Sequence, residues 1–141
     1  MSFEKIFQFT MQWEGGSKYT NDSDDPGGGT KYGISQKENP DIDVENLTEE
    51  DAMAIYQKRY WNHVAAGKDD DLDMAAFDSA VNCGVPTVLK WLPTCITWED
   101  VTAMRRQHYV ALTNANPHLD KYLMGWENRV KALEQFIIKG E

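Results

Sequence analysis

Glu14 is the residue of this sequence whose position most clearly suggests chemistry. It ends a segment whose apolar residues recur at helical spacing, and that spacing places it near the middle of the apolar face. The other members of this face are Phe3, Ile6, Phe7, Thr10 and Met11. We expect partial burial and the negative end of the helix dipole to favour the protonated form of Glu14. A carboxyl group that keeps its proton near neutral pH can act as a general acid.

A turn rich in glycine and carboxylates follows this glutamate. Gly15 and Gly16 are expected to end the helix, and Asp22, Asp25 and Thr30 come soon after them. Glycosidic bond cleavage needs one acid for the leaving oxygen and one group that prepares a water molecule. The carboxylates and the Thr30 hydroxyl are suited to the second task, and the glycines let backbone approach a sugar ring closely.

Most of the elements expected around these residues are helices. Thr48 and Thr97 are each followed three residues later by an aspartate, a capping-box pattern that predicts helix starts. Glycines and prolines mark most of the other boundaries. We expect helices over residues 3–14, 48–62, 72–83, 86–91, 98–113, 118–124 and 126–137.

A small β-hairpin is expected directly after the first helix. Tyr19, Thr20, Tyr32 and Ile34 are candidates for short strands, and the turn is expected within residues 25–29. The predicted fold class is therefore mainly α, with a small hairpin following the first helix.

The core faces of the helices follow from the same periodicity. The residues expected inside are Met53, Tyr56 and Tyr60; Met74, Phe77, Ala80 and Val81; Val101, Met104, His108 or Tyr109, and Leu112; and Val130, Leu133, Phe136 and Ile137. We also expect Trp61, Trp91, Trp98 and Trp126 in the core, although one of them could line a cleft.

Composition and charge exclude several classes of protein. The chain has 141 residues and a net charge of −9, with ten acidic residues between positions 21 and 51. Nucleic-acid binding needs a basic surface, and tight adhesion to anionic membranes also needs cationic residues. No apolar run is long enough to span a membrane, and the N-terminus does not resemble a secretory signal. We therefore expect synthesis and retention in the cytoplasm until another factor releases the protein.

The sequence predicts neither a metal site nor a cofactor. His63, His108 and His118 lack the spacing of metal ligands. Residues 22–33 and 69–73 resemble calcium loops only in part, because the first has glycine at position twelve and the second lacks the required glycine. Cys83 and Cys95 form no C-x-x-C motif, and we expect Cys83 to be a buried free thiol.

The order of these motifs resembles glycoside hydrolase family 108, the phage-type N-acetylmuramidases with a lysozyme-like fold. The family pattern reads E-G-G, then N-D-x-x-D-P-G-G-x-T-x-x-G-I. The matching residues are Glu14-Gly15-Gly16, Asn21-Asp22, Asp25-Pro26-Gly27-Gly28, Thr30 and Gly33-Ile34. Later matches are the helix ending in Tyr60-Trp61, then Phe77-Asp78 with Val81-Asn82-Cys83-Gly84, and Gly125-Trp126-Glu127-Asn128-Arg129-Val130. Ser17 departs from the family, which commonly has an aromatic residue there.

The resemblance implies one lysozyme-like catalytic domain over residues 1–141, with a catalytic lobe at about 1–70 and a helical lobe at about 71–141. It implies that Glu14 is the general acid. It also implies that Asp22 and Thr30 act on the water, with Asp25 as the rival carboxylate. We further expect Tyr19, Tyr32 and Asn82 to bind substrate.

The function implied is cleavage of the β-1,4 bond between N-acetylmuramic acid and N-acetylglucosamine in bacterial peptidoglycan. The expected setting is a monomeric phage endolysin that waits in the host bacterial cytoplasm and reaches the periplasm and cell wall after holin-dependent release. A secreted prophage-derived homologue is the alternative setting. The acidic composition also leaves open a chitosanase-like enzyme, which would act on a cationic glycan. A non-catalytic glycan-binding or phage structural protein remains the alternative from another class.

Overall fold

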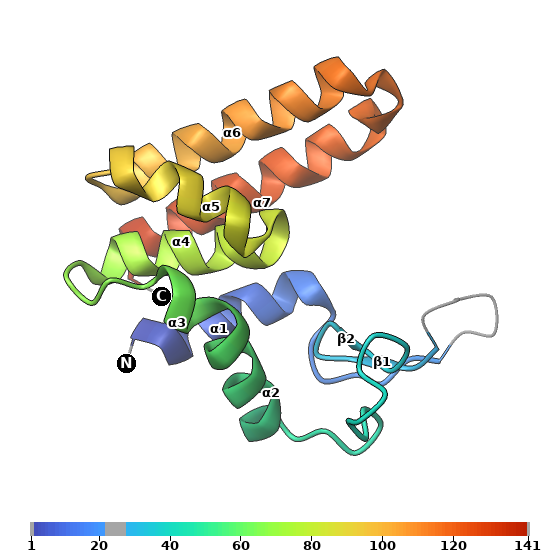
Figure 1. Ribbon diagram of the computed structural model, residues 1–141. Helices are drawn as coiled ribbons and strands as arrows, with labels where there is room; N and C mark the ends of the chain where they lie inside the picture. Colours follow the sequence, from blue (N-terminus) through green and yellow to red (C-terminus); the bar gives the residue numbers. More distant parts are fainter. Residues whose placement is uncertain (1, 22–27, 141) are drawn as a thin grey trace.

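A computed structural model describes residues 2–21 and 28–140 as a mainly α-helical structure (Figure 1). This confirms the predicted fold class. The helices are α1 Ser2–Glu14, α2 Glu49–Tyr56, α3 Asn62–Val64, α4 Asp70–Cys83, α5 Val85–Trp91, α6 Trp98–Ala115 and α7 Asp120–Lys139. A π-helical segment spans Gln57–Trp61, and short 3₁₀ turns span Leu92–Thr94 and Pro117–Leu119. Within the described residues, no helix has the length and apolar character needed to cross a membrane.

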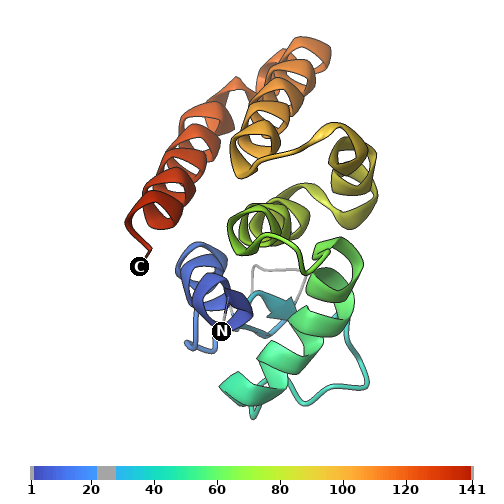
Figure 2. The same ribbon diagram turned by 90° about the vertical axis from the view of Figure 1, so that its left-hand side faces the viewer.

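Helix α4 is the central element of the fold. It contacts α1, α5, α6 and α7, and the view along its axis shows it surrounded by the other helices (Figure 2). Phe77 of α4 is fully buried, and its ring lies 5.4 Å from that of Phe3 and 6.0 Å from that of Trp61. The largest core cluster includes residues from both predicted lobes, for example Phe7 and Phe77. The boundary near residue 70 stays a prediction.

The apolar face predicted for α1 is confirmed. Phe3, Ile6, Phe7, Thr10 and Met11 are all buried. After Glu14 the backbone turns through positive φ values of 103° at Gly15 and 61° at Gly16. Glycine adopts such values without steric cost, so the helix ends where the sequence indicated.

The predicted core faces of the later helices are also largely confirmed. Buried residues are Tyr56, Met74, Phe77, Ala80, Val101, Tyr109, Val130, Leu133 and Ile137, and half-buried ones are Met53, Tyr60, Val81, Met104, His108, Leu112 and Phe136. Of the two alternatives at positions 108 and 109, Tyr109 is therefore the core residue. Both capping boxes form, at Thr48 with Asp51 and at Thr97 with Asp100.

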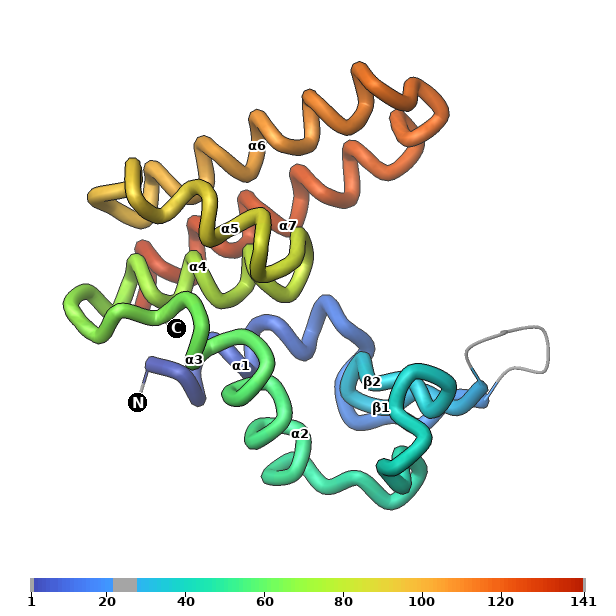
Figure 3. The backbone as a smooth tube through the Cα atoms, in the orientation of Figure 1, coloured from blue at the N-terminus to red at the C-terminus, as the bar shows by residue number. Residues whose placement is uncertain are grey.

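The hairpin forms, and its turn lies after the predicted one. An antiparallel bridge between Thr20 and Thr30 encloses the turn expected within residues 25–29, of which only residues 28 and 29 are described. Strands β1 Thr30–Lys31 and β2 Ile34–Ser35 pair antiparallel, and Tyr32-Gly33 joins them. Both turn residues have positive φ, 53° and 72°, as a two-residue type I′ turn requires. The backbone twist of a type I′ turn matches the right-handed twist of two paired strands. Tyr32 therefore occupies the first position of this turn and is not a strand residue. The tube view shows the hairpin at the end of α1, to one side of the helices (Figure 3).

Two helix boundaries also differ from prediction. The helix expected to end near residue 62 continues through the π-helical segment to Val64. The two helices expected on either side of Gly125 are one helix, α7. Glycine within a helix costs roughly 1 kcal/mol relative to alanine, and tertiary packing can outweigh that cost. In α7 the rings of Tyr122 and Trp126 stack across the glycine, with centroids 5.9 Å apart.

Gly33 has a further constraint that a stability measurement can test. A Cβ atom at this position would lie 2.6 Å from the Tyr56 hydroxyl oxygen and 3.1 Å from the Glu14 Cβ. We expect Gly33→Ala to destabilise the protein through backbone strain, about 1–2 kcal/mol, and through this contact. Gly67→Ala is the matched control, because Gly67 has a similar φ of 79° but a Cβ atom there would have no atom within 4 Å. Urea unfolding should show the larger loss for Gly33→Ala, and equal losses would contradict the close packing.

Candidate active site

Glu14 is the last residue of α1 and forms an ion pair with Arg129 of α7. The Arg129 Nη1 atom lies 2.7 Å from Glu14 Oε2. The Glu14 side chain keeps 26% of its exposure, whereas that of Arg129 keeps 6%. The carboxyl group is therefore held from the protein side and remains open to a ligand on the other.

Arg129 is itself held by Asp78 of the central helix. Its Nε and Nη2 atoms lie 3.2 and 2.9 Å from the two carboxylate oxygens of Asp78. Asp78 is completely buried and also accepts a hydrogen bond of 2.7 Å from the Thr10 hydroxyl. Thr10 is the polar member of the apolar face of α1, so this residue connects α1 to the same carboxylate.

A second buried arginine completes the network. Arg105 of α6 is fully buried, and its Nη1 atom lies 2.8 Å from Asp78 Oδ2 and 3.2 Å from Ser79 Oγ. Its Nε atom donates to the Tyr109 hydroxyl at 2.8 Å. Among the described residues, its Nη2 atom is a buried side-chain nitrogen with no hydrogen-bond partner.

The charges of this network set the ionisation of its buried members. Burial alone would raise the pKa of Asp78, but the two guanidinium groups outweigh burial and lower that pKa to about 2. Burial would lower the pKa of Arg129, but the carboxylates of Asp78 and Glu14 reverse the effect and raise it. The Asp78 carboxylate therefore lies between two guanidinium groups, and Glu14 pairs with one of them.

The hairpin is fastened to the same end of α1. The Tyr32 backbone N–H donates to the Gly16 carbonyl at 2.8 Å, and the Tyr56 hydroxyl donates to the Tyr32 carbonyl at 2.7 Å. Burial, followed by the nearby Glu14 charge, raises the pKa of Tyr56. Its hydroxyl therefore stays protonated and remains a donor to the hairpin.

Thr30 lies in β1, three residues before Gly33, and is half-buried. Its backbone exchanges two hydrogen bonds with Thr20, of 2.9 and 2.7 Å. The hairpin thus brings Thr30 to the side of the molecule where α1 ends. Asp22 and Asp25 lie outside the described residues, so their roles, like that of Thr30, stay predictions.

The three residues predicted to bind substrate lie in different surroundings. Tyr19 is half-buried and covers Gly29, leaving no room there for a Cβ atom. Tyr32 lines a pocket of about 270 Å³ together with Ser17 and Met11, and Glu14 is not part of that lining. Asn82, near the end of α4, accepts a hydrogen bond from the Tyr109 hydroxyl. Their contacts with substrate stay predictions.

No site role was predicted for Asp78, Arg105 or Arg129, although Asp78 and Arg129 lie within the family motifs. Each is a charged residue that interrupts an apolar helical stripe, four residues from a core position: Met74, Val101 and Leu133, respectively. This is the criterion that singled out Glu14. The same criterion, applied to every helix, would have identified these three charged residues, although it could not have shown which of them pair.

The network should make stability depend on acid pH. The lowered pKa of Asp78 means that its stabilising contribution is present above its ordinary pKa of 3.8 and is lost as pH falls towards about 2. We expect Asp78→Asn to cost roughly 3–5 kcal/mol at pH 7, since it leaves two arginines poorly compensated. Urea unfolding should show that the difference in unfolding free energy between Asp78→Asn and wild type becomes smaller as pH falls from 4 to about 2.

The surface pair of Arg106 and Glu134, 2.6 Å apart, provides the control. Glu134→Gln should cost less than Asp78→Asn, because both side chains of this pair keep part of their solvent exposure. If Asp78→Asn behaved like this control, the buried network would not be a major source of stability.

Two comparisons relate this chain to known proteins. The family model described as glycosyl hydrolase 108 matches residues 7–84, a range that contains Glu14, the hairpin and Asp78. The solved structure of SagA from Brucella abortus is similar over 97% of this chain and 94% of that chain, with a TM-score of 0.69 and 23% sequence identity. That likeness shows a shared fold. A search of curated proteins found no match. Because the family model covers more than half of the sequence, the chain belongs to glycosyl hydrolase family 108 and is a glycoside hydrolase.

Proposed function

We propose that this protein hydrolyses the β-1,4 bond between N-acetylmuramic acid and N-acetylglucosamine of bacterial peptidoglycan, with Glu14 as general acid. The observation that carries the proposal is the partly exposed Glu14 carboxyl group, paired with Arg129 at the point where the hairpin joins α1. Family membership supplies the reaction class, because glycosidases use a protonated carboxyl group on the leaving oxygen.

Arg129 has a defined part in this mechanism. When Glu14 gives its proton to the leaving sugar oxygen, a carboxylate forms 2.7 Å from a guanidinium group. That positive charge stabilises the carboxylate as it develops. Arg129 can do this without moving, since Asp78 already holds its other nitrogen atoms. Water then attacks the opposite face of the sugar.

The water-positioning roles belong to the hairpin in this proposal. Asp22 and Thr30 prepare the water, and Asp25 is the alternative carboxylate. If these groups activate water and do not attack the sugar, the anomeric configuration of the product is inverted.

For the biological setting, we propose a monomeric phage endolysin. It would accumulate in the host bacterial cytoplasm and act on the cell wall after release by a holin. A secreted prophage-derived homologue would use the same site.

The net charge of −9 favours a second candidate, a chitosanase-like enzyme, because an acidic surface attracts a cationic glycan. A non-catalytic glycan-binding protein would keep the fold without turnover. Loss of turbidity of a peptidoglycan suspension, compared with reducing-sugar release from chitosan, separates the three. Turbidity loss alone supports the muramidase, and sugar release from chitosan alone supports the chitosanase-like enzyme. The absence of both results supports the non-catalytic protein.

Glu14→Gln should abolish most activity and leave the fold intact, because it removes the transferable proton and changes little volume. We expect turnover to fall by about 10²–10⁴-fold, the usual contribution of acid–base catalysis. Glu134→Gln is the matched control, since it also removes a carboxylate paired with an arginine, and it should keep wild-type turnover. Peptidoglycan turbidity assays measure both variants. Activity of Glu14→Gln within about tenfold of wild type would exclude Glu14 as the acid.

Asp22→Asn and Thr30→Ala should each lower kcat strongly and change KM little, because both residues are proposed to act on water. NMR during the first turnovers should show the inverted anomer. A retained anomer would exclude the water-positioning roles while leaving Glu14 as the acid. If Asp25→Asn is the more damaging change and melts like wild type, Asp25 is the second functional carboxylate.

A further inference from the structure

Helix α7 begins well before the arginine that pairs with Glu14, and the preceding residues on the same face of the helix are aromatic. Trp126 and Tyr122 precede Arg129 by three and seven positions, which places all three on one face of the helix. At 1.5 Å per residue, Tyr122 lies about 10 Å along the helix from Arg129. The start of α7 lies on the same side of the molecule as the hairpin (Figure 1).

These aromatic rings form one continuous stack. The Tyr109 and Trp126 rings lie 4.8 Å apart at an angle of 19°, and those of Trp126 and Tyr122 lie 5.9 Å apart at 28°. The inner end of the stack is fixed, because Tyr109 is buried and bonded to Arg105 and Asn82. The outer end is open, because Tyr122 is 49% exposed. The network behind Glu14 therefore continues into a rigid aromatic surface.

Gly125 leaves space on this face. It precedes Arg129 by one helical turn and lies between Tyr122 and Arg129 along the helix. It is exposed, and a Cβ atom there would have no atom within 4 Å. No packing contact in the described residues therefore requires glycine here, although glycine weakens the helix. Because Gly125 has no side chain, a flat ligand has space to lie against α7 beside the exposed ring of Tyr122.

We propose that Tyr122, Gly125 and the edge of Trp126 form a glycan platform that binds a sugar unit of the strand away from the bond at Glu14. This inference rests on the proposed function. The C–H face of a sugar ring packs on an aromatic ring, and the hydroxyl group of the exposed Tyr122 can reach sugar hydroxyl groups. The ammonium group of the exposed Lys121 lies over the Tyr122 ring, 5.2 Å from its centroid. A sugar that packs on this ring displaces the flexible lysine side chain, which then becomes a further donor at the edge of the platform. Binding energy from a remote sugar favours long strands over short fragments.

The first test measures binding of peptidoglycan glycan fragments of different length to the full chain carrying Glu14→Gln, which prevents turnover. In that background, Tyr122→Ala should weaken binding of long fragments by about tenfold and leave the disaccharide unchanged. Tyr122→Phe should restore most of the binding, since it keeps the ring. Equal binding of long fragments by the Tyr122→Ala protein and its parent would overturn the platform.

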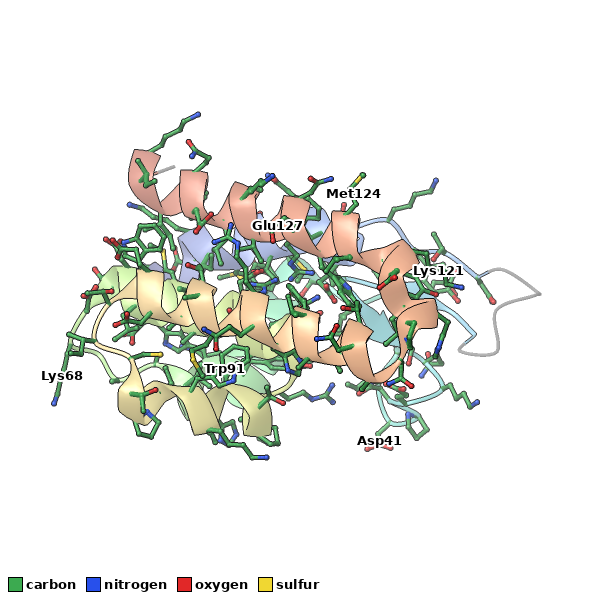
Figure 4. All side chains as sticks on the ribbon, turned by 90° about the horizontal axis from the view of Figure 1, so that it is seen from above. Asp41, Lys68, Trp91, Lys121, Met124 and Glu127 are labelled. Carbon is green, nitrogen blue, oxygen red and sulfur yellow. The ribbon has the colours of Figure 1, made fainter. Side chains whose placement is uncertain are left out.

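Met124→Ala is the control for a general effect of apolar surface. Met124 lies on the same helix and is 76% exposed, but it is two residues from Tyr122 and points away from α6 (Figure 4). Its removal should not change glycan binding. Equal weakening by Met124→Ala and Tyr122→Ala would also overturn the proposal, because it would indicate non-specific adhesion.

The second test uses the space at Gly125. Gly125→Gln places a good helix former at an exposed helical position, so the melting temperature should rise. The new side chain occupies the space beside Tyr122, so binding of long fragments should fall. A variant that is more stable and binds equally well would exclude a ligand against this face. These results are independent of the general acid: full activity of Glu14→Gln would remove the proposed mechanism, whereas unchanged binding by Tyr122→Ala would remove only the platform.

Discussion

The buried carboxylate of Asp78 is the constraint on which the rest of this structure depends. An ionised aspartate without solvent requires compensation by opposite charge and by hydrogen bonds. Its two oxygens receive these from Thr10 of α1, Arg105 of α6 and Arg129 of α7. Three helices are thereby fixed around α4, and their relative positions follow from the need to satisfy one side chain.

This arrangement also explains how a helix end can serve as a candidate active site. Glu14 lies beyond the last buried turn of α1, where the polypeptide would otherwise be free to fray. Arg129 holds its carboxyl group from one side, and Tyr56 holds the hairpin backbone beside it. Rigid placement of this kind reduces the reorganisation needed during reaction. The orientation of Glu14 is consequently a property of the helical core as well as of the motif that contains it.

Local signals in the sequence predicted much of this structure. The apolar face of α1, the glycines that end it and both capping boxes depend on neighbouring residues, and all appear as expected. The apolar periodicity of the first helix singled out Glu14 in the same way. The turn at Tyr32-Gly33 was missed because a tyrosine with positive φ has no clear sequence signal and is set by strand pairing. The continuity of α7 was missed because ring stacking across Gly125 outweighs the local preference of glycine. The partners of Glu14 and Asp78 could not be predicted, because pairing between distant charged residues depends on how the helices pack.

The ion pair between Glu14 and Arg129 joins residues 115 positions apart in the chain. During synthesis the ribosome releases Glu14, the hairpin and Asp78 well before either arginine. Until α6 and α7 follow, the two carboxylates have no cationic partner, and the buried position of Asp78 is unfavourable. The geometry around Glu14 is therefore completed only when the last helix docks, so a nascent or truncated chain carries the motif without the contacts that orient Glu14.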